Sequence, residues 1–66
     1  MADVVSFRIF IGDGQWKLNR NEEFVCVFDS RDGAIDACLS FRDEIEKHGG
    51  AASIVINEPD GTESSV

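Results

Sequence analysis

Residues 7–18 read FRIFIGDGQWKL, and this stretch decides the fold because two alternating apolar runs meet at Asp13-Gly14. Asp-Gly between such runs is the strongest short-range signal for a tight β-hairpin. A two-residue turn sets Ile11 opposite Trp16, so the large apolar side chains of both strands share one face. That face carries Ile9, Ile11, Trp16 and Leu18, and the other face carries Arg8, Phe10, Lys17 and Asn19. The hairpin therefore predicts a sheet with one buried face and one open face.

The apolar run at 23–28 predicts a third strand. We expect residues 20–22 to form a three-residue loop that places Leu18 opposite Phe24. A two-residue loop would set Leu18 against Glu23 and put a carboxylate in the core, where an unpaired charge is costly. In the expected register, the open face of this strand carries Val25 and Val27.

A helix is predicted at about 31–48, after a start signal at Asp29-Ser30, of which either residue suits the N-cap. Gly49-Gly50 is expected to end it, because glycine readily adopts the left-handed conformation that closes many helices. Helical spacing brings small and apolar side chains to one side, and this side should cover the sheet. These residues are Ala34, Ala37, Cys38, Phe41 and Ile45.

A fourth strand is predicted at 51–57, joined to the third by the helix. Such crossovers are right-handed in nearly all proteins. The fourth strand then lies parallel to the first, in the order 3-2-1-4; the alternative places it beside the third. Residues 62–66 are either a short closing strand or a loose tail. We therefore expect one small α+β domain over residues 1–66, of order β-β-β-α-β, with a four-stranded, mostly antiparallel sheet and one helix on one face.

The length and charge of the chain bound its stability and its surroundings. A domain of 66 residues buries only about 60% of the surface that its unfolded chain exposes, so its stability is marginal without a partner. Cys26 and Cys38 are too few for a disulfide framework, and we expect both to be buried thiols. No apolar run is long enough for a membrane span, and residues 1–4 lack the basic start of a secretory signal. These features indicate a cytoplasmic protein.

The whole pattern resembles a family of small bacterial proteins known as domain of unknown function 2188. The resemblance extends over nearly the entire chain and rests on three groups of residues. They are Asp13-Gly14-Gln15-Trp16-Lys17-Leu18 after an alternating strand, Val27-Phe28-Asp29-Ser30 before Ala34-Ile35-Asp36-Ala37, and Ile54-Val55-Ile56-Asn57 before Asp60-Gly61. Gln15 and Ser30 depart from the family pattern, which usually has glycine and threonine there. The resemblance implies the fold and carries over no catalytic residue or ligand.

The sequence pattern indicates neither an enzyme nor a cofactor site. His48 is the single histidine, and on a helix it lies roughly 15 Å along the axis from Cys38, too far for a catalytic Cys/His pair. Asp36 and Asp43 share a solvated helix face and belong to no oxygen-rich loop of the kind that holds calcium. We therefore expect a protein that is not an enzyme, with no catalytic residues, no metal and no cofactor.

The net charge of −7 weighs against nucleic acid as a partner, because phosphate contacts dominate nucleic-acid affinity. Arg8 and Lys17 on the open face leave weak nucleic-acid binding as one alternative. A second alternative is an acidic helix face that docks on a basic nucleic-acid-binding protein in imitation of phosphate groups. The residues of that acidic face are Asp32, Asp36, Asp43 and Glu44.

The open sheet face gives the first functional prediction. Phe10, Val25 and Val27 form an apolar patch there, and Arg8 and Lys17 form its polar rim. Such a patch on a marginally stable domain indicates association with a protein. We therefore predict a non-enzymatic interaction or accessory module that uses these five residues, most simply in a homodimer and without membrane contact.

Overall fold

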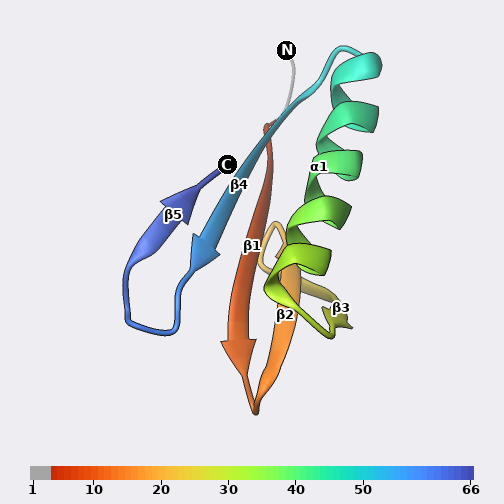
Figure 1. Ribbon diagram of the computed structural model, residues 1–66. Coiled ribbons are helices and arrows are strands. Elements are labelled where there is room, and N and C mark those ends of the chain that lie inside the picture. Colours follow the sequence, from red (N-terminus) through yellow and green to blue (C-terminus); the bar gives the residue numbers. More distant parts are fainter. Residues whose placement is uncertain (1–3) are drawn as a thin grey trace.

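The computed structural model describes residues 4–66, so the first three residues, part of the segment used to argue against a secretory signal, lie outside the described range. Within it the chain forms five strands and one helix, arranged as one sheet with the helix beside it (Figure 1). The elements are β1 (Val4–Gly12), β2 (Gln15–Arg20), β3 (Glu23–Phe28), α1 (Arg31–Lys47), β4 (Ala51–Asn57) and β5 (Glu63–Ser65). The predicted strands and helix are all present.

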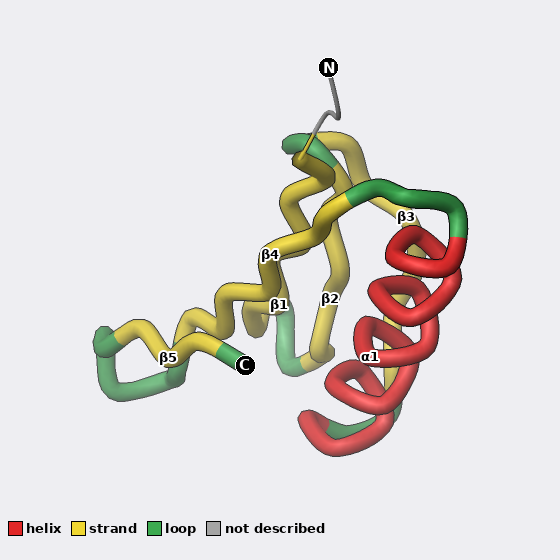
Figure 2. Tube along the Cα trace, turned by 90° about the horizontal axis from the view of Figure 1, so that it is seen from above, coloured by secondary structure: helices red, strands yellow, loops and turns green. Residues whose placement is uncertain are grey.

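The strands lie in the order β3-β2-β1-β4-β5. β1 is central, antiparallel to β2 and parallel to β4, while β2–β3 and β4–β5 are antiparallel pairs. The predicted order 3-2-1-4 is confirmed, with the fourth strand beside the first. The sheet is nevertheless five-stranded and mixed, because the segment left open as a strand or a tail pairs with β4 as β5. Helix α1 covers one face of the sheet and leaves the other open (Figure 2).

The β1–β2 hairpin has the predicted register, with Ile11 opposite Trp16 and Phe10 opposite Lys17. Its turn residues Asp13 and Gly14 have φ values of 53° and 76°. A tight turn with two positive φ values matches the right-handed twist of its strands, which is why Asp-Gly is favoured there. Ile11, next to the turn, is 42% exposed, so only the deeper half of this face joins the core.

The β2–β3 connection is a two-residue turn, and the predicted three-residue loop is wrong. Asn21 and Glu22 form the turn with φ values of 49° and 70°, and Arg20 pairs with Glu23. Asn21 is anchored to the neighbouring strand: its Oδ1 accepts a hydrogen bond from the Ser6 amide at 2.9 Å, and its own amide donates to the Ser6 carbonyl at 2.8 Å. These bonds hold Asn21 in the left-handed region, and Glu22 adopts the same region after it.

A β-bulge follows this turn and changes the predicted register of β3. The pairing runs Asn19 with Phe24 and then Leu18 with Cys26, so Val25 is the extra residue. Without the bulge, the register set by Arg20 and Glu23 would have put Val25 opposite Leu18 and Cys26 opposite Lys17 on the open face. The inserted residue returns Cys26 to the core face, opposite Leu18, and places Val27 opposite Lys17 on the open face.

The helix begins and ends on the predicted signals. Ser30, one of the two expected caps, is the N-cap, and its Oγ accepts from the Gly33 amide at 3.0 Å. At the other end Gly49 has a φ of 83°, and the Gly50 amide donates to the Ile45 carbonyl at 2.9 Å. A Cβ on Gly50 would lie 2.8 Å from Ile45 Cγ2, so this close approach requires glycine.

The core lies between α1 and the covered face of the sheet. Its buried members are Phe7, Ile9, Leu18, Ala34, Cys38, Ile54 and Ile56. They come from α1 and the three central strands, whereas the edge strands β3 and β5 contribute no fully buried residue. Within residues 4–66, every buried side-chain nitrogen or oxygen has a hydrogen-bond partner. The packed interior is therefore small and centred on β1.

Candidate functional site

Large apolar side chains are exposed side by side along the edge strand β3. Phe24 is 61% exposed, Val27 45% and Val25 43%. Phe24 pairs with Asn19 and Val27 with Lys17, and both of these neighbours lie on the open face of the sheet. Three exposed apolar residues within four positions are unusual for the surface of a small monomer, where single exposed apolar residues are the rule.

Val25 does not lie on the open face, where the sequence placed it. Because it is the bulged residue, its side chain is turned to the helix side, where it lines a groove with Phe7 and Phe41. Phe24 occupies the open face instead, although the sequence placed it in the core. The bulge thus exchanges two residues between the faces and wraps the apolar surface around the edge of the sheet.

The groove lies between the C-terminal half of α1 and the β2–β3 hairpin, and we name it the β3 groove. It has a volume of about 300 Å³ and is lined by Phe7, Arg20, Val25, Phe41, Glu44 and Ile45. Phe41 stacks on the buried Phe7 with ring centroids 5.6 Å apart and remains 40% exposed. The floor of the β3 groove is therefore aromatic. We define the β3 surface as Phe24, Val25, Val27 and Phe41.

Phe10 lies on the open face as predicted, but its side chain is half-buried and not freely exposed. It borders a shallow hollow of about 520 Å³ whose other lining residues include Pro59 and Gly61. These two residues belong to the turn that joins β4 to β5, the segment that the sequence left open as a strand or a tail. The β4–β5 hairpin thus borders one side of Phe10. The most exposed part of the apolar surface lies at the opposite edge of the sheet, on β3.

Both cations predicted on the open face are paired within the chain. Arg8 Nη1 donates to Asn57 Oδ1 at 2.6 Å and to Glu63 Oε2 at 3.1 Å. Lys17 Nζ lies 3.6 Å from Asp13 Oδ2. These carboxylates offset the positive charge that a nucleic-acid phosphate would need, which argues against the nucleic-acid alternative.

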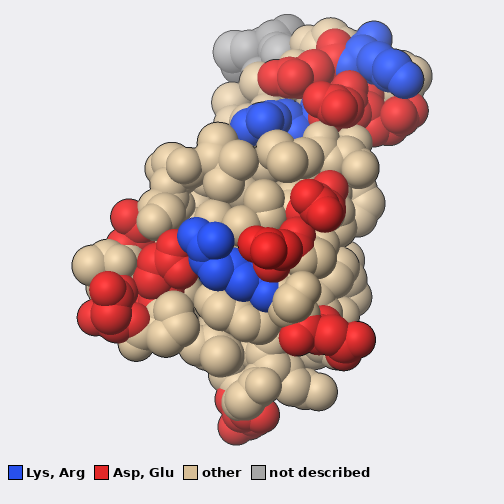
Figure 3. Space-filling model, in the orientation of Figure 1, with Lys and Arg blue, Asp and Glu red and all other residues tan. Residues whose placement is uncertain are grey.

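The predicted acidic face is exposed on α1 throughout. Its members Asp32, Asp36, Asp43 and Glu44 are all exposed. Glu44 Oε1 lies 3.5 Å from His48 Nε2, and the other three join none of the ion pairs found within residues 4–66. Figure 3 shows acidic side chains gathered at the upper end of the molecule and beside β5, with basic side chains and further acidic ones on the surface between them.

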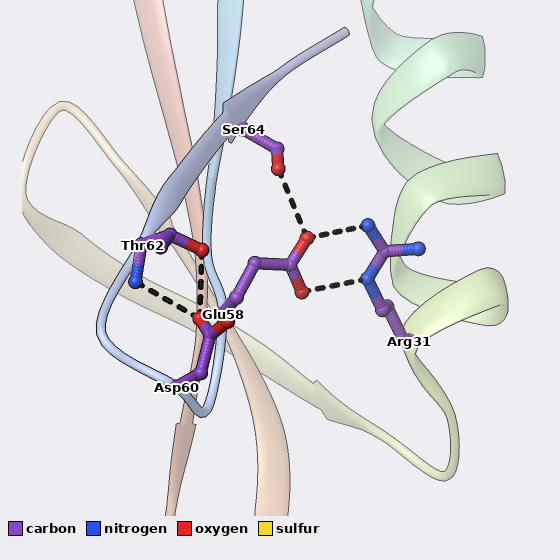
Figure 4. A network of polar contacts seen from close by, with 5 residues as sticks. All are labelled: Arg31, Glu58, Asp60, Thr62 and Ser64. Carbon is purple, nitrogen blue, oxygen red and sulfur yellow. Dashed lines mark hydrogen bonds and ion pairs between the residues drawn. The ribbon is translucent and has the colours of Figure 1, made fainter.

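A polar network that the sequence did not predict ties the start of α1 to the β4–β5 turn (Figure 4). Arg31 binds Glu58 through two bonds, from Nε at 3.0 Å and from Nη2 at 2.6 Å, and Ser64 Oγ also donates to Glu58 at 3.1 Å. The Arg31 hydrogen bond lowers the pKa of Glu58, and the same bond raises the pKa of Arg31. A cation in the first turn opposes the helix dipole. Arg31 at that position was the signal that a carboxylate partner lay nearby.

Beside it, the β4–β5 turn is held by Asp60. Its Oδ1 accepts from the Thr62 amide at 3.0 Å and from Thr62 Oγ1 at 2.7 Å. These bonds lower the pKa of Asp60. The turn carboxylate therefore has a structural role, as its Pro-Asp-Gly context indicates.

The two thiols face the core. Cys38 is fully buried, as predicted. Cys26 is half-buried, so the prediction of a buried thiol holds only in part there. Burial, and then the proximity of Cys26, raise the pKa of Cys38 to about 11. Within residues 4–66 no three His, Cys, Asp or Glu side chains gather as a metal-ligand set. In the same range, no helix combines the length and the apolar character needed to span a membrane.

Comparisons with known proteins add no residue to this site. No family model, no curated protein and no solved structure matches the chain. The resemblance to domain of unknown function 2188 therefore stays a prediction from the sequence. The functional interpretation depends on the exposure, shape and charge of the β3 surface and the β3 groove.

Proposed function

We propose that this chain is a non-enzymatic protein-interaction module that binds its partner through the β3 surface. The observation that carries the proposal is the 61% exposure of Phe24 beside Val25 and Val27. An exposed aromatic side chain among aliphatic neighbours resembles the centre of a protein interface, where aromatic anchors carry most of the binding energy. In a chain this short, covering these side chains would also add to a small core.

The bulge favours docking through side chains over the addition of another strand. A regular edge strand offers its main chain to a partner strand, and bulges or charges at the edge discourage such pairing. β3 begins with Glu23 and is interrupted at Val25. A partner is therefore expected to cover the apolar side chains of β3 rather than extend the sheet.

The state of the thiols supports a role without catalysis. A catalytic cysteine needs a lowered pKa and partial exposure. Cys38 has a pKa raised to about 11 and is fully buried, so it stays protonated near neutral pH. His48, the histidine that would serve as its base, is the C-cap of α1 and pairs with Glu44.

Capture with Phe24→Asp tests the proposal. The wild-type chain and the variant are immobilised and offered first the purified chain itself and then an extract of the native host. We expect the wild type to retain a protein that Phe24→Asp loses, because a carboxylate at the centre of the contact would have to be desolvated. Val4→Asp is the matched control, since Val4 is 60% exposed and lies outside the β3 surface.

Circular dichroism must show that both variants keep the wild-type fold. The proposal is contradicted if the wild type retains neither its own copies nor a host protein, or if Val4→Asp reduces retention as much as Phe24→Asp does. Equal loss in both variants would indicate a general effect of added negative charge rather than a contact at β3.

A further inference from the structure

The β3 groove carries opposite charges on two different elements. Arg20 lines it from β2 and Glu44 lines it from α1. Arg20 joins none of the ion pairs or side-chain hydrogen bonds found within residues 4–66. Glu44 is 67% exposed, and its neighbour His48 is charged only when protonated. An apolar floor is thus flanked by one cation and one anion that have capacity for a further partner.

This distribution is self-complementary. A two-fold interface brings the same patch of both subunits together, so each charge must meet its opposite after a half-turn. With Arg20 on one wall and Glu44 on the other, a half-turn can place each beside its counterpart in a second copy. The other acidic residues of that helix face, Asp32, Asp36 and Asp43, cannot do this, because each carboxylate would meet another.

Phe24 supplies the apolar contact for such an arrangement. It lines a second hollow with Arg20 and Val25 at the end of the β2–β3 hairpin, which places it beside the β3 groove at the edge of the sheet. A groove of about 300 Å³ with an exposed Phe41 on its floor can receive an aromatic ring from another copy. Docking of two copies would cover the aromatic side chains of both.

We infer that the partner of the β3 surface is a second copy of this chain, related by a two-fold axis, in which Arg20 of each copy pairs with Glu44 of the other and Phe24 enters the other copy's groove. This inference rests on the proposed function and names its partner. Each chain carries a net charge of −7, so two copies repel at long range. The two Arg20–Glu44 pairs supply local attraction and fix the register of the contact.

Mixing two charge-reversal variants tests the inference. Sedimentation equilibrium of the wild type from roughly 10 µM to 1 mM, the range of weak protein complexes, should show a monomer–dimer equilibrium. Arg20→Glu and Glu44→Arg should each weaken it by about tenfold or more, because every intersubunit pair then becomes a repulsion. An equimolar mixture of the two variants should regain the wild-type dimer, because both pairs are again of opposite sign.

The controls match the change in charge. Arg20→Glu takes the net charge from −7 to −9 and Glu44→Arg takes it from −7 to −5. Lys47→Glu and Asp36→Arg make the same two changes at exposed helix positions outside the groove. Both controls should dimerise as the wild type does, and mixing them should change nothing.

Three results would overturn the inference: a wild-type chain that stays monomeric at 1 mM, about the weakest affinity tested; single variants that dimerise normally; or a mixture of folded variants that stays monomeric. A monomeric wild type that still retains a host protein in a Phe24-dependent manner would overturn this inference alone and leave the proposed function standing. Loss of both kinds of binding would remove the two together.

Discussion

The β1–β2 and β2–β3 hairpins start from similar sequence patterns, but one contributes to the core and the other to an exposed surface. Each joins apolar strands by a two-residue turn with two positive φ values, Asp13-Gly14 in the first and Asn21-Glu22 in the second. In the first hairpin, Ile9 of β1 is completely buried. In the second, Phe24 of β3 is 61% exposed. The difference teaches that the position of a strand in the sheet, more than its apolar content, decides whether it builds core or surface.

The two strands differ in exposure because different numbers of strands and helices surround them. β1 has a strand on each side and lies beneath α1, so its inward side chains are enclosed from all directions. β3 has one neighbouring strand and a bulge, so its side chains reach solvent on both faces. The apolar content of β3 is thus available for contact with another molecule.

The largest expected difference in the free energy of unfolding comes from truncating one side chain in each hairpin to alanine. Ile9→Ala should lower the free energy of unfolding by about 2–5 kcal/mol, through lost burial and the cavity left behind. That is a large share of the roughly 3–10 kcal/mol expected for a domain of this length. Val27→Ala should change it by less than about 0.5 kcal/mol. Urea unfolding at a concentration where the chain is monomeric measures both, and equal losses would contradict the comparison.

Substitutions at the turn residues of these two hairpins should change the free energy of unfolding in opposite directions. Glu22 has a φ of 70°, and Glu22→Gly should raise the free energy of unfolding by roughly 0.5–1 kcal/mol, because glycine adopts this conformation without strain. Gly14 has a φ of 76°, and Gly14→Ala should lower it by a similar amount. Thermal unfolding gives both signs. A destabilised Glu22→Gly would mean that the Glu22 side chain contributes more than its backbone costs.

The third hairpin, β4–β5, is held by charge, and its effect should appear in the pH dependence of stability. The folded-state pKa of Glu58 lies below its ordinary value of 4.5, so its ionised form stabilises the fold above that pH. This contribution is lost as the pH falls through the lowered pKa. Glu58→Gln should therefore be less stable than the wild type at pH 7, and the two melting temperatures should converge in acid.

Melting temperatures of both proteins at intervals from pH 7 down to about pH 3 measure this convergence. Asp36→Asn removes one exposed carboxylate from α1 and is the charge-matched control. A constant difference between wild type and Glu58→Gln over the whole range would show that the Arg31–Glu58 bond does not depend on ionisation. Asp60 also has a lowered pKa, so some acid destabilisation should persist in the Glu58 variant.

Most of the fold could be predicted from the sequence, because its signals are local. Asp13-Gly14 fixed the central register, Ser30 and Gly49 marked the ends of the helix, and the crossover favoured β4 beside β1 over the alternative beside β3. The four residues expected on the acidic face are all exposed on α1. The register of β3 could not be predicted, since a turn of Asn21 and Glu22 has no glycine to reveal it and depends on bonds to Ser6.

The candidate site was predicted only in outline. An apolar surface on the sheet was expected, but its centre moved from Phe10 to Phe24 because of one bulged residue and one additional hairpin. The bulge breaks a regular strand register in order to place Cys26 opposite Leu18 on the core face, and that balance is decided only when both strands are packed.

The sequence by itself determined which segments become the helix and the first four strands, how the first hairpin pairs, and that the chain is acidic. These properties follow from turn chemistry, side-chain periodicity and residue charge, all of which act within a few residues. Only the tertiary structure decided that β5 closes the sheet, that Val25 turns toward the helix, and that Arg20 and Glu44 flank one groove. Such contacts join residues far apart in the chain, and they form only where packing brings separate elements together.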